Sequence, residues 1–243
     1  MKTIFRGLIT LITLLLCWEG IVVFFKLPSY ILPPPSQVLL TLFTQSAIIG
    51  KEASITLLEM LTGFLLGVLL GCTAGLAITL FKPLKQWCLP ILIISQAIPT
   101  FAIAPLLVIW LGFGLASKIA TTVLMLFFPI TSAFYDGLQN TPPGFLDLAK
   151  TMNATKWRLF YTIRIPAALP SLASGIRIAA VIAPIGAVVG EWVGSSRGLG
   201  YLMLNANARL QIDMMFAALI VMIALALALY FTVDKLLRVL IWW

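Results

Sequence analysis

Histidine is absent from the 243 residues of the chain, and only 10% of them are charged. Without histidine the chain cannot build a Ser–His–Asp triad, a histidine-ligated metal site or a histidine proton shuttle. The charged fraction is far below the roughly 25% of a soluble domain, so the chain cannot cover a surface that faces water. We therefore expect a membrane protein with no catalytic residues and no metal site.

Two further kinds of site are missing from the sequence. The three cysteines, Cys17, Cys72 and Cys88, lie in or beside apolar runs without CxxC spacing, which favours small packing residues over a disulfide framework. No G-x-x-x-x-G-K-[ST] loop occurs, and the only Gly-Lys pair, at 50–51, is followed by Glu52. The chain is therefore not expected to bind ATP by that route, and we predict no cofactor in it.

What the sequence has in abundance is apolar length. Hydrophobic residues make up 61% of the chain and the mean hydropathy is +1.09. A transmembrane helix needs about 20 apolar residues. This predicts an all-α integral membrane protein with about six transmembrane helices, at 4–25, 55–80, 89–111, 118–135, 172–193 and 214–243.

Proline and glycine mark the expected breaks. Pro184 and Gly186 predict an interruption of the fifth span, while 81–87 and 194–213 are expected to be loops. The prolines at 33–35 cannot continue a helix. After them, either a short interfacial helix capped by Ser36 or a plain external loop fits the residues. We place an N-terminal span and its proline-bearing segment at 1–53, and the core at 54–238.

The second span carries a glycine at every fourth position. Four-residue spacing places small residues on one face of a helix, which lets another helix backbone approach closely. The sequence therefore predicts a tightly packed helix pair along Gly63, Gly67, Gly71 and Gly75.

Lysine and arginine predict the orientation. One side of a six-span arrangement holds both termini, the 81–87 loop and the 136–170 interval, with ten basic residues against five on the other side. Arg177 lies just inside the fifth span, nearest the first group. Positive residues concentrate in cytoplasmic loops. The termini and the 136–170 interval are therefore expected in the cytoplasm.

That interval is the longest polar stretch of the chain. Apolar residues at helical spacing predict a short helix at 145–152, with Asp147 in its first turn and Asn153 ending it in a left-handed conformation. A second amphipathic segment at 155–163 is expected to stop before Pro166. Two interpretations stay open: a pair of helices in the membrane interface, or a knob on which a cytoplasmic partner docks.

The spacing in this interval resembles the coupling motif of ABC importer permeases, which reads Glu-Ala-Ala, then Gly six residues after the Glu, then Ile-x-Leu-Pro. The residues at the matching places are Asp147, Leu148, Ala149, Asn153, Ile163, Ile165 and Pro166. Asp for Glu, Leu for the first Ala, Asn for Gly and Ile for Leu are the departures.

Other stretches are similar to the nitrate, sulfonate and taurine subgroup of these permeases: 32–38, 95–114 and 198–203. Residues 190–219 resemble permeases that import a thiamine pyrimidine precursor, a hydroxymethylpyrimidine. The resemblance implies a type I permease of a bacterial inner membrane, with a cytoplasmic coupling helix between spans 4 and 5. It also implies a homodimer, separate ATPase subunits that use the ATP, and an external substrate-binding protein.

Polar residues inside apolar spans are candidates for the transport pathway because burying them is costly. The candidates are Glu59, Gln96, Thr100 and Glu191. Glu191 lines the pathway or its outer gate, is a surface carboxylate near the headgroups, or pairs with an external arginine. Glu59 lines the pathway or reaches the interface. Gln96 and Thr100 contact substrate or satisfy the carbonyls that Pro99 leaves open. Glu19, at the end of the first span, is expected to be structural.

Two other classes of protein were weighed against an importer permease. An ion-coupled secondary transporter typically shows repeated halves and carboxylates in mid-span, and neither is evident. An intramembrane enzyme could still use an Asp–Asp or Ser–Lys pair. Neither class explains the 136–170 interval, and basic residues beside spans indicate membrane orientation, not nucleic-acid binding.

Overall fold

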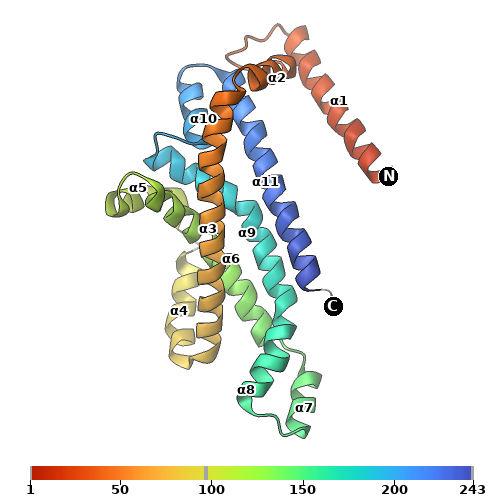
Figure 1. Ribbon diagram of the computed structural model, residues 1–243, viewed down its shortest axis with the longest axis vertical. Helices are drawn as coiled ribbons and strands as arrows, with labels where there is room; N and C mark the ends of the chain where they lie inside the picture. The colour runs from red at the N-terminus through yellow and green to blue at the C-terminus, as the bar shows by residue number, and fades with distance from the viewer. Residues whose placement is uncertain (1, 96–97, 242–243) are drawn as a thin grey trace. The chain divides into compact units, whose positions relative to one another are not determined.

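A computed structural model describes residues 2–95 and 98–241, and regular structure in these ranges is entirely helical (Figure 1). The helices are α1 (Lys2–Phe24), α2 (Pro35–Thr44), α3 (Ser46–Leu80), α4 (Lys82–Ser95), α5 (Thr100–Leu111), α6 (Leu115–Gln139), α7 (Pro143–Thr151), α8 (Lys156–Leu159), the π-helical turn η1 (Phe160–Arg164), α9 (Ile165–Gly194), α10 (Leu199–Ala208) and α11 (Ile212–Leu240). The predicted all-helical class is confirmed.

Four helical segments are long and apolar enough to cross a membrane: Ser46–Leu80, Leu115–Gln139, Lys156–Gly194 and Ile212–Leu240. The apolar part of α1 (Ile12–Phe24) and α5 are shorter. The expected count of six spans is therefore not confirmed among the described residues, although four of the six predicted spans correspond to these long helices.

Several predicted boundaries were wrong. The single span expected at 89–111 is divided between α4 and α5, and Pro99 is the N-cap of α5 in an extended conformation. Only Phe81 separates α3 from α4, so most of the expected 81–87 loop is helical. The 194–213 segment, expected to be a loop, contains helix α10. The glycine and serine residues at the start of this segment had suggested a loop throughout.

Prolines within α9 do not interrupt it. The helix runs from Ile165 through Pro184 to Gly194, so the predicted break at 184–186 is wrong. Pro184 is buried next to Ala180, Ala183 and Ala187, all with no exposed surface. Packing against neighbouring helices offsets the hydrogen bond that proline removes.

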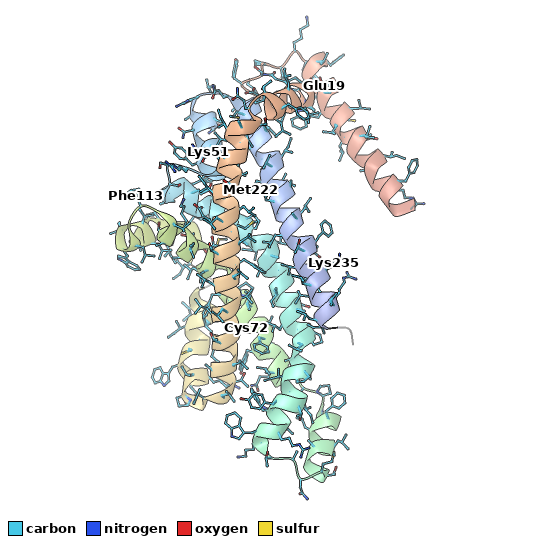
Figure 2. All side chains as sticks on the ribbon, viewed as in Figure 1. Glu19, Lys51, Cys72, Phe113, Met222 and Lys235 are labelled. Atoms are coloured by element: carbon cyan, nitrogen blue, oxygen red, sulfur yellow. The ribbon has the colours of Figure 1, made fainter. Side chains whose placement is uncertain are left out.

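The chain forms two compact units, one of Met1–Thr56 with Ser196–Ala224 and one of Leu57–Ser195 with Leu225–Trp243. In the first unit the Glu19 carboxylate accepts hydrogen bonds from Ser36, at 3.1 Å from the backbone N–H and 2.7 Å from Oγ. Figure 2 shows Glu19 where α1 approaches α2. Ser36 is therefore not the cap of α2, whose N-cap is Pro34; a carboxylate from α1 stabilises that helix end instead, and the structural role expected of Glu19 is confirmed.

The first unit also contains the start of α10, held on α3 by two side chains. The backbone N–H of Gly198 donates to Glu52 Oε2 at 2.5 Å, and that of Leu199 donates to Thr56 Oγ1 at 2.8 Å. Elsewhere in the unit Thr41 Oγ1 donates to Asp213 Oδ2 at 2.7 Å, which ties α2 to the start of α11. The bonds from Gly198 and Leu199 satisfy backbone donors that the start of α10 leaves free.

The second unit is organised around α6. A Cβ added at the four glycines of α3 would lie 2.6–3.2 Å from α6 side chains, each of them 59 positions later in the chain: Thr122, Leu126, Ile130 and Phe134. The predicted glycine face is confirmed, and the constant offset shows that α3 and α6 run parallel. The chain between them therefore has to return through α4 and α5.

An adjoining face of α6 packs on α9 in the same close manner. Gly186 of α9 lies against Thr122, and Gly190 against Lys118, so the two helices run antiparallel. Gly175 approaches Ala133, and Gly137 of α6 approaches Ala168 and Ser171 of α9. Near the middle of α9, Arg177 Nε donates to Asp234 Oδ1 of α11 at 2.7 Å.

The glycine face yields the first prediction. Gly71→Leu would force a side chain into Ile130, which a Cβ already meets at 2.8 Å, and overpacking costs about 1–3 kcal/mol. We expect a clearly lower thermal unfolding midpoint for the purified chain in detergent. Gly50→Leu, on the same helix with nothing within 4 Å of an added Cβ, is the control. Equal midpoints for the two variants would contradict the packing.

Candidate functional site

Helix α7 is the short helix expected in the 136–170 interval. Its side chains divide by exposure: Ala149 is 2% exposed, whereas Phe145, Leu148 and Met152 are 53%, 57% and 73% exposed. These three lie at helical spacing and form an apolar face that no described part of the chain covers. Asp147 is also exposed and has a partner of its own. A small helix with one uncovered apolar face is suited to insertion into a groove of another protein.

Asn153 ends α7 in the predicted left-handed conformation, with φ of 50°. The N–H of Ala154 donates to the carbonyl of Ala149 at 3.0 Å, and that of Met152 donates to Leu148 at 3.1 Å. This is a Schellman-type ending, in which the residue after the helix takes the left-handed conformation that asparagine tolerates better than most side chains. The left-handed conformation predicted for Asn153 is therefore confirmed.

The chain turns at once into the next helix. Thr155 is its N-cap, and Thr155 Oγ1 accepts from the N–H of Arg158 at 3.3 Å. From Lys156 to Gly194 the backbone is helical without a break, so the predicted stop before Pro166 is wrong. Pro166 lies in the first turn of α9, directly after the π-helical turn η1, whose wider hydrogen-bond pattern links Ile165 N–H to the Phe160 carbonyl.

Residues 143–164, here named the corner segment, lie together at one end of α9 (Figure 1). Their aromatic residues form a cluster: Trp157 stacks on Tyr161 with ring centroids 5.9 Å apart, and Phe160 meets both rings edge-on. Phe160 is buried, whereas Trp157 and Tyr161 are each 60% exposed. The corner is thus rigidly packed on its inner side and aromatic on its outer side.

A cavity of about 460 Å³ lies beside this cluster. Its walls come from the end of α3 (Thr79 and Leu80) and from Lys156, Trp157 and Arg164 of the corner segment, among others. Among the described residues, the lining holds two basic side chains and no acidic one.

Two of the predicted pathway carboxylates meet inside the second unit. Glu59 of α3 and Glu191 of α9 are both 0% exposed, and their carboxyl groups lie within hydrogen-bonding reach of each other. Lys118 of α6 forms an ion pair with Glu59 Oε1 and donates to Ser195 Oγ at 3.0 Å. Glu59 therefore does not reach the interface, and Glu191 is not a surface carboxylate. The helices α3, α6 and α9 are joined by this buried charge cluster.

Lys118 and Ser195 had not been singled out from the sequence. The sequence carries a signal for Glu59 alone, which precedes Gly63 by four residues and so continues the glycine face. Lys118, four residues before Thr122, is paired with it only through the register of α3 on α6. The Glu59–Lys118 ion pair extends the row of contacts between α3 and α6 by one helical turn beyond Gly63 and Thr122.

The remaining predicted residues are more dispersed. Ile163 lies in η1, while Ile165 and Pro166 begin α9. Thr100 is the first residue of α5 and half-buried, and Gln96 lies outside the described residues. All three cysteines are free; Cys17 is exposed and the other two are half-buried, so none is a fully buried packing residue. Figure 2 shows Phe113 at the tip of the turn between α5 and α6, where it is 84% exposed.

The fold and these segments can now be compared with known proteins. A probable ABC transporter permease of Haemophilus influenzae is 53% identical over 94% of both chains. The formylaminopyrimidine transport permease ThiX of Halalkalibacterium halodurans is 36% identical over 88% of this chain and 86% of its own. Among solved structures, a chain of the inward-facing MetNI methionine ABC transporter has the same fold, with a TM-score of 0.69 at 19% identity over 81% of this chain and 97% of that one.

The model of a permease family matches residues 63–241, which include α6, the corner segment and α9. This match and the relatives assign the function class: membrane permeases of ABC importers. The chain belongs to the family described as the binding-protein-dependent transport system inner membrane component.

Proposed function

We propose that α7 is the coupling helix of this permease and docks in a groove of a cytoplasmic ATPase. The observation that carries the proposal is the apolar face of Phe145, Leu148 and Met152, exposed on a helix whose ending is fixed by Asn153. Behind that corner the chain is helical from Lys156 to Gly194. A push on α7 is therefore passed to a membrane-spanning helix with no flexible linker between them.

The motif residues divide into contact and support. Leu148 contacts the ATPase, with Asp147 at the edge of the contact. Ala149 is buried, and its carbonyl accepts the bond that closes the Asn153 turn, so both support the corner. Ile163, Ile165 and Pro166 join the corner to α9 across the π-helical turn.

The same proposal fixes an orientation. The bias of ten basic residues against five assigns the corner segment and both termini to the cytoplasm of a bacterium, with a multi-pass core in its inner membrane. Six crossings follow if α1 crosses and if α4 and α5 together make one crossing. The parallel packing of α3 on α6 supports the latter, because the chain has to return between them.

ATP is used by partner subunits, and the chain itself carries no cofactor. Two copies of this chain form the permease, an arrangement that lets two α7 helices engage two ATPases. An external binding protein delivers the solute. In the first unit a cavity of about 360 Å³, lined by Arg209, Asp213 and Gln211 among others, offers polar groups for its docking.

The pathway assignment of Glu59, Gln96, Thr100 and Glu191 stays a prediction. Glu59 and Glu191 are fully buried and engaged with each other or with Lys118, so they contact a solute only if the cluster opens. Such opening accompanies movement of α3 or α9 relative to α6.

A thiamine pyrimidine precursor is the proposed solute. The ThiX relative is named for formylaminopyrimidine transport and is 36% identical. The alternatives are represented by a riboflavin permease of Chloroflexus aurantiacus at 33% and by the taurine permease of Escherichia coli at 27%. The higher identity over most of the chain favours a pyrimidine over a sulfonate, and family membership favours ATP-driven over ion-coupled transport.

The docking face is tested by Leu148→Arg. Burying an arginine in an apolar groove removes an anchor and adds an unpaired charge, so we expect at least about a ten-fold loss of uptake and of ATPase co-purification. Asn140→Arg, exposed in the same interval but outside α7, adds the same charge and is the control. Equal uptake by the two variants would rule out the face as the docking site.

Orientation is tested by labelling single cysteines. In a chain whose three native cysteines are replaced by serine, a membrane-impermeant maleimide on intact cells should label Phe113→Cys and not Met152→Cys. Both positions are highly exposed, at 84% and 73%, so access depends on the side of the membrane. Permeabilised cells that lack the ATPase subunits, where both should react, are the control. Labelling of Met152→Cys on intact cells would reverse the orientation.

Solute choice is tested on the external binding protein that delivers substrate to this permease. A formylaminopyrimidine should raise its thermal unfolding midpoint, and the rise should grow with the logarithm of ligand concentration above the Kd, because a ligand that binds only the folded state stabilises it. Taurine and riboflavin serve as comparison ligands. A shift with taurine alone would favour the sulfonate alternative.

A further inference from the structure

The cavity beside the aromatic cluster has features that the docking of α7 does not use. It is lined by residues of the corner segment and by the last residues of α3, not by the apolar face of α7. Its two basic residues, Lys156 and Arg164, have no acidic counterpart in the lining. A concave site with uncompensated positive charge attracts anions.

One of the residues that line this cavity, Arg164, has a polar atom without a hydrogen-bond partner among the described residues. Arg164 Nε is buried and has no hydrogen-bond partner in the part of the chain that the structure describes. A buried charged donor without an acceptor is costly, and such groups normally have a partner. The missing partner is an acceptor. Arg164 as a whole is half-buried, so its guanidinium can turn toward the cavity and donate to an oxygen of an anion that enters it.

The backbone at this point is also unusual. Arg164 is the last residue of η1, and π-helical turns of this kind occur frequently at functional sites. The turn precedes Pro166 and interrupts an otherwise regular α-helix. Its first and last residues, Phe160 and Arg164, both line the cavity. Both η1 and the cavity lie in the second unit.

The surroundings point to a lipid as the source of the anion. Leu80 ends an apolar 35-residue helix and is 41% exposed, while Trp157 is 60% exposed. Tryptophan at the end of a span is typical of the headgroup level, and basic pockets between spans on the cytoplasmic side bind anionic headgroups. A free anion would need no such apolar and aromatic lining.

We propose that this cavity binds the phosphate of an anionic phospholipid headgroup, with Arg164 as its main donor and Lys156 as a second charge. The lipid fills the space between the end of α3 and the base of the corner segment, where it supports the junction to α9. The proposal rests on the cytoplasmic orientation proposed above.

The test is native mass spectrometry of the full-length chain in detergent, titrated with phosphatidylglycerol or with zwitterionic phosphatidylcholine. The wild type should retain phosphatidylglycerol in preference, and Arg164→Gln should weaken this retention about ten-fold, as expected for a hydrogen bond to a charged group. Arg158→Gln removes the same charge from an exposed residue that does not line the cavity, and should leave retention unchanged.

Other outcomes would overturn the proposal. Equal retention by Arg164→Gln and wild type removes the site. Displacement of the lipid by millimolar inorganic phosphate assigns the cavity to a free anion. Normal lipid retention with loss of ATPase co-purification assigns it to a protein interface. If Arg164→Gln does not fold, Lys156→Gln replaces it in the same assay. Lipid retention is measured without the ATPase, and ATPase co-purification is a separate assay, so a failure of lipid retention leaves the coupling proposal untouched.

Discussion

The packing of the second unit depends on how closely α6 approaches its neighbours. Thr122 contacts both Gly63 of α3 and Gly186 of α9, so a single residue of α6 sets two interhelical distances. In a membrane the hydrophobic effect does not drive helices together, and close backbone contact supplies much of the attraction instead. The glycines are therefore required for the packing, because a larger side chain at any of these positions would push two helices apart.

The buried charge cluster stands at the end of this close packing. Glu59, Lys118 and Glu191 are one helical turn beyond Thr122, and Gly190 lets α9 approach the Lys118 backbone. Removing one partner of a buried ion pair costs about 3–5 kcal/mol, whereas replacing the whole pair by apolar residues is often neutral. Such a cluster adds little to stability, but it strongly disfavours a shift in register between the three helices. It is suited to hold one arrangement until the helices separate.

Sequence patterns predicted correctly those features that depend on local backbone conformation and on the size of side chains a few residues apart. The glycine spacing of α3, the extent of α7 and the left-handed Asn153 follow from steric demands that act within a few residues. The same rules failed at Pro166 and Pro184, because tertiary packing and a π-helical turn absorb prolines that would end an isolated helix. The pairing of Glu59 with Lys118 could not be read from either segment alone, since it requires the register between two helices.

One continuous helical segment, Lys156–Gly194, joins the corner segment to the buried charge cluster. From Lys156 to Glu191 the chain is one helix, so movement imposed at the corner reaches the cluster as translation or rotation of α9. Rotation would be resisted by the contacts of Gly175 and Gly186 with α6, which leave little room for side chains to slide past. Bodily tilting of α9 together with α6 keeps these contacts and strains the link to α3 instead. Packed helices rearrange between discrete states and do not deform continuously. The Glu59–Lys118 ion pair joins α3 to α6, so it is the first interaction that such a rearrangement would break.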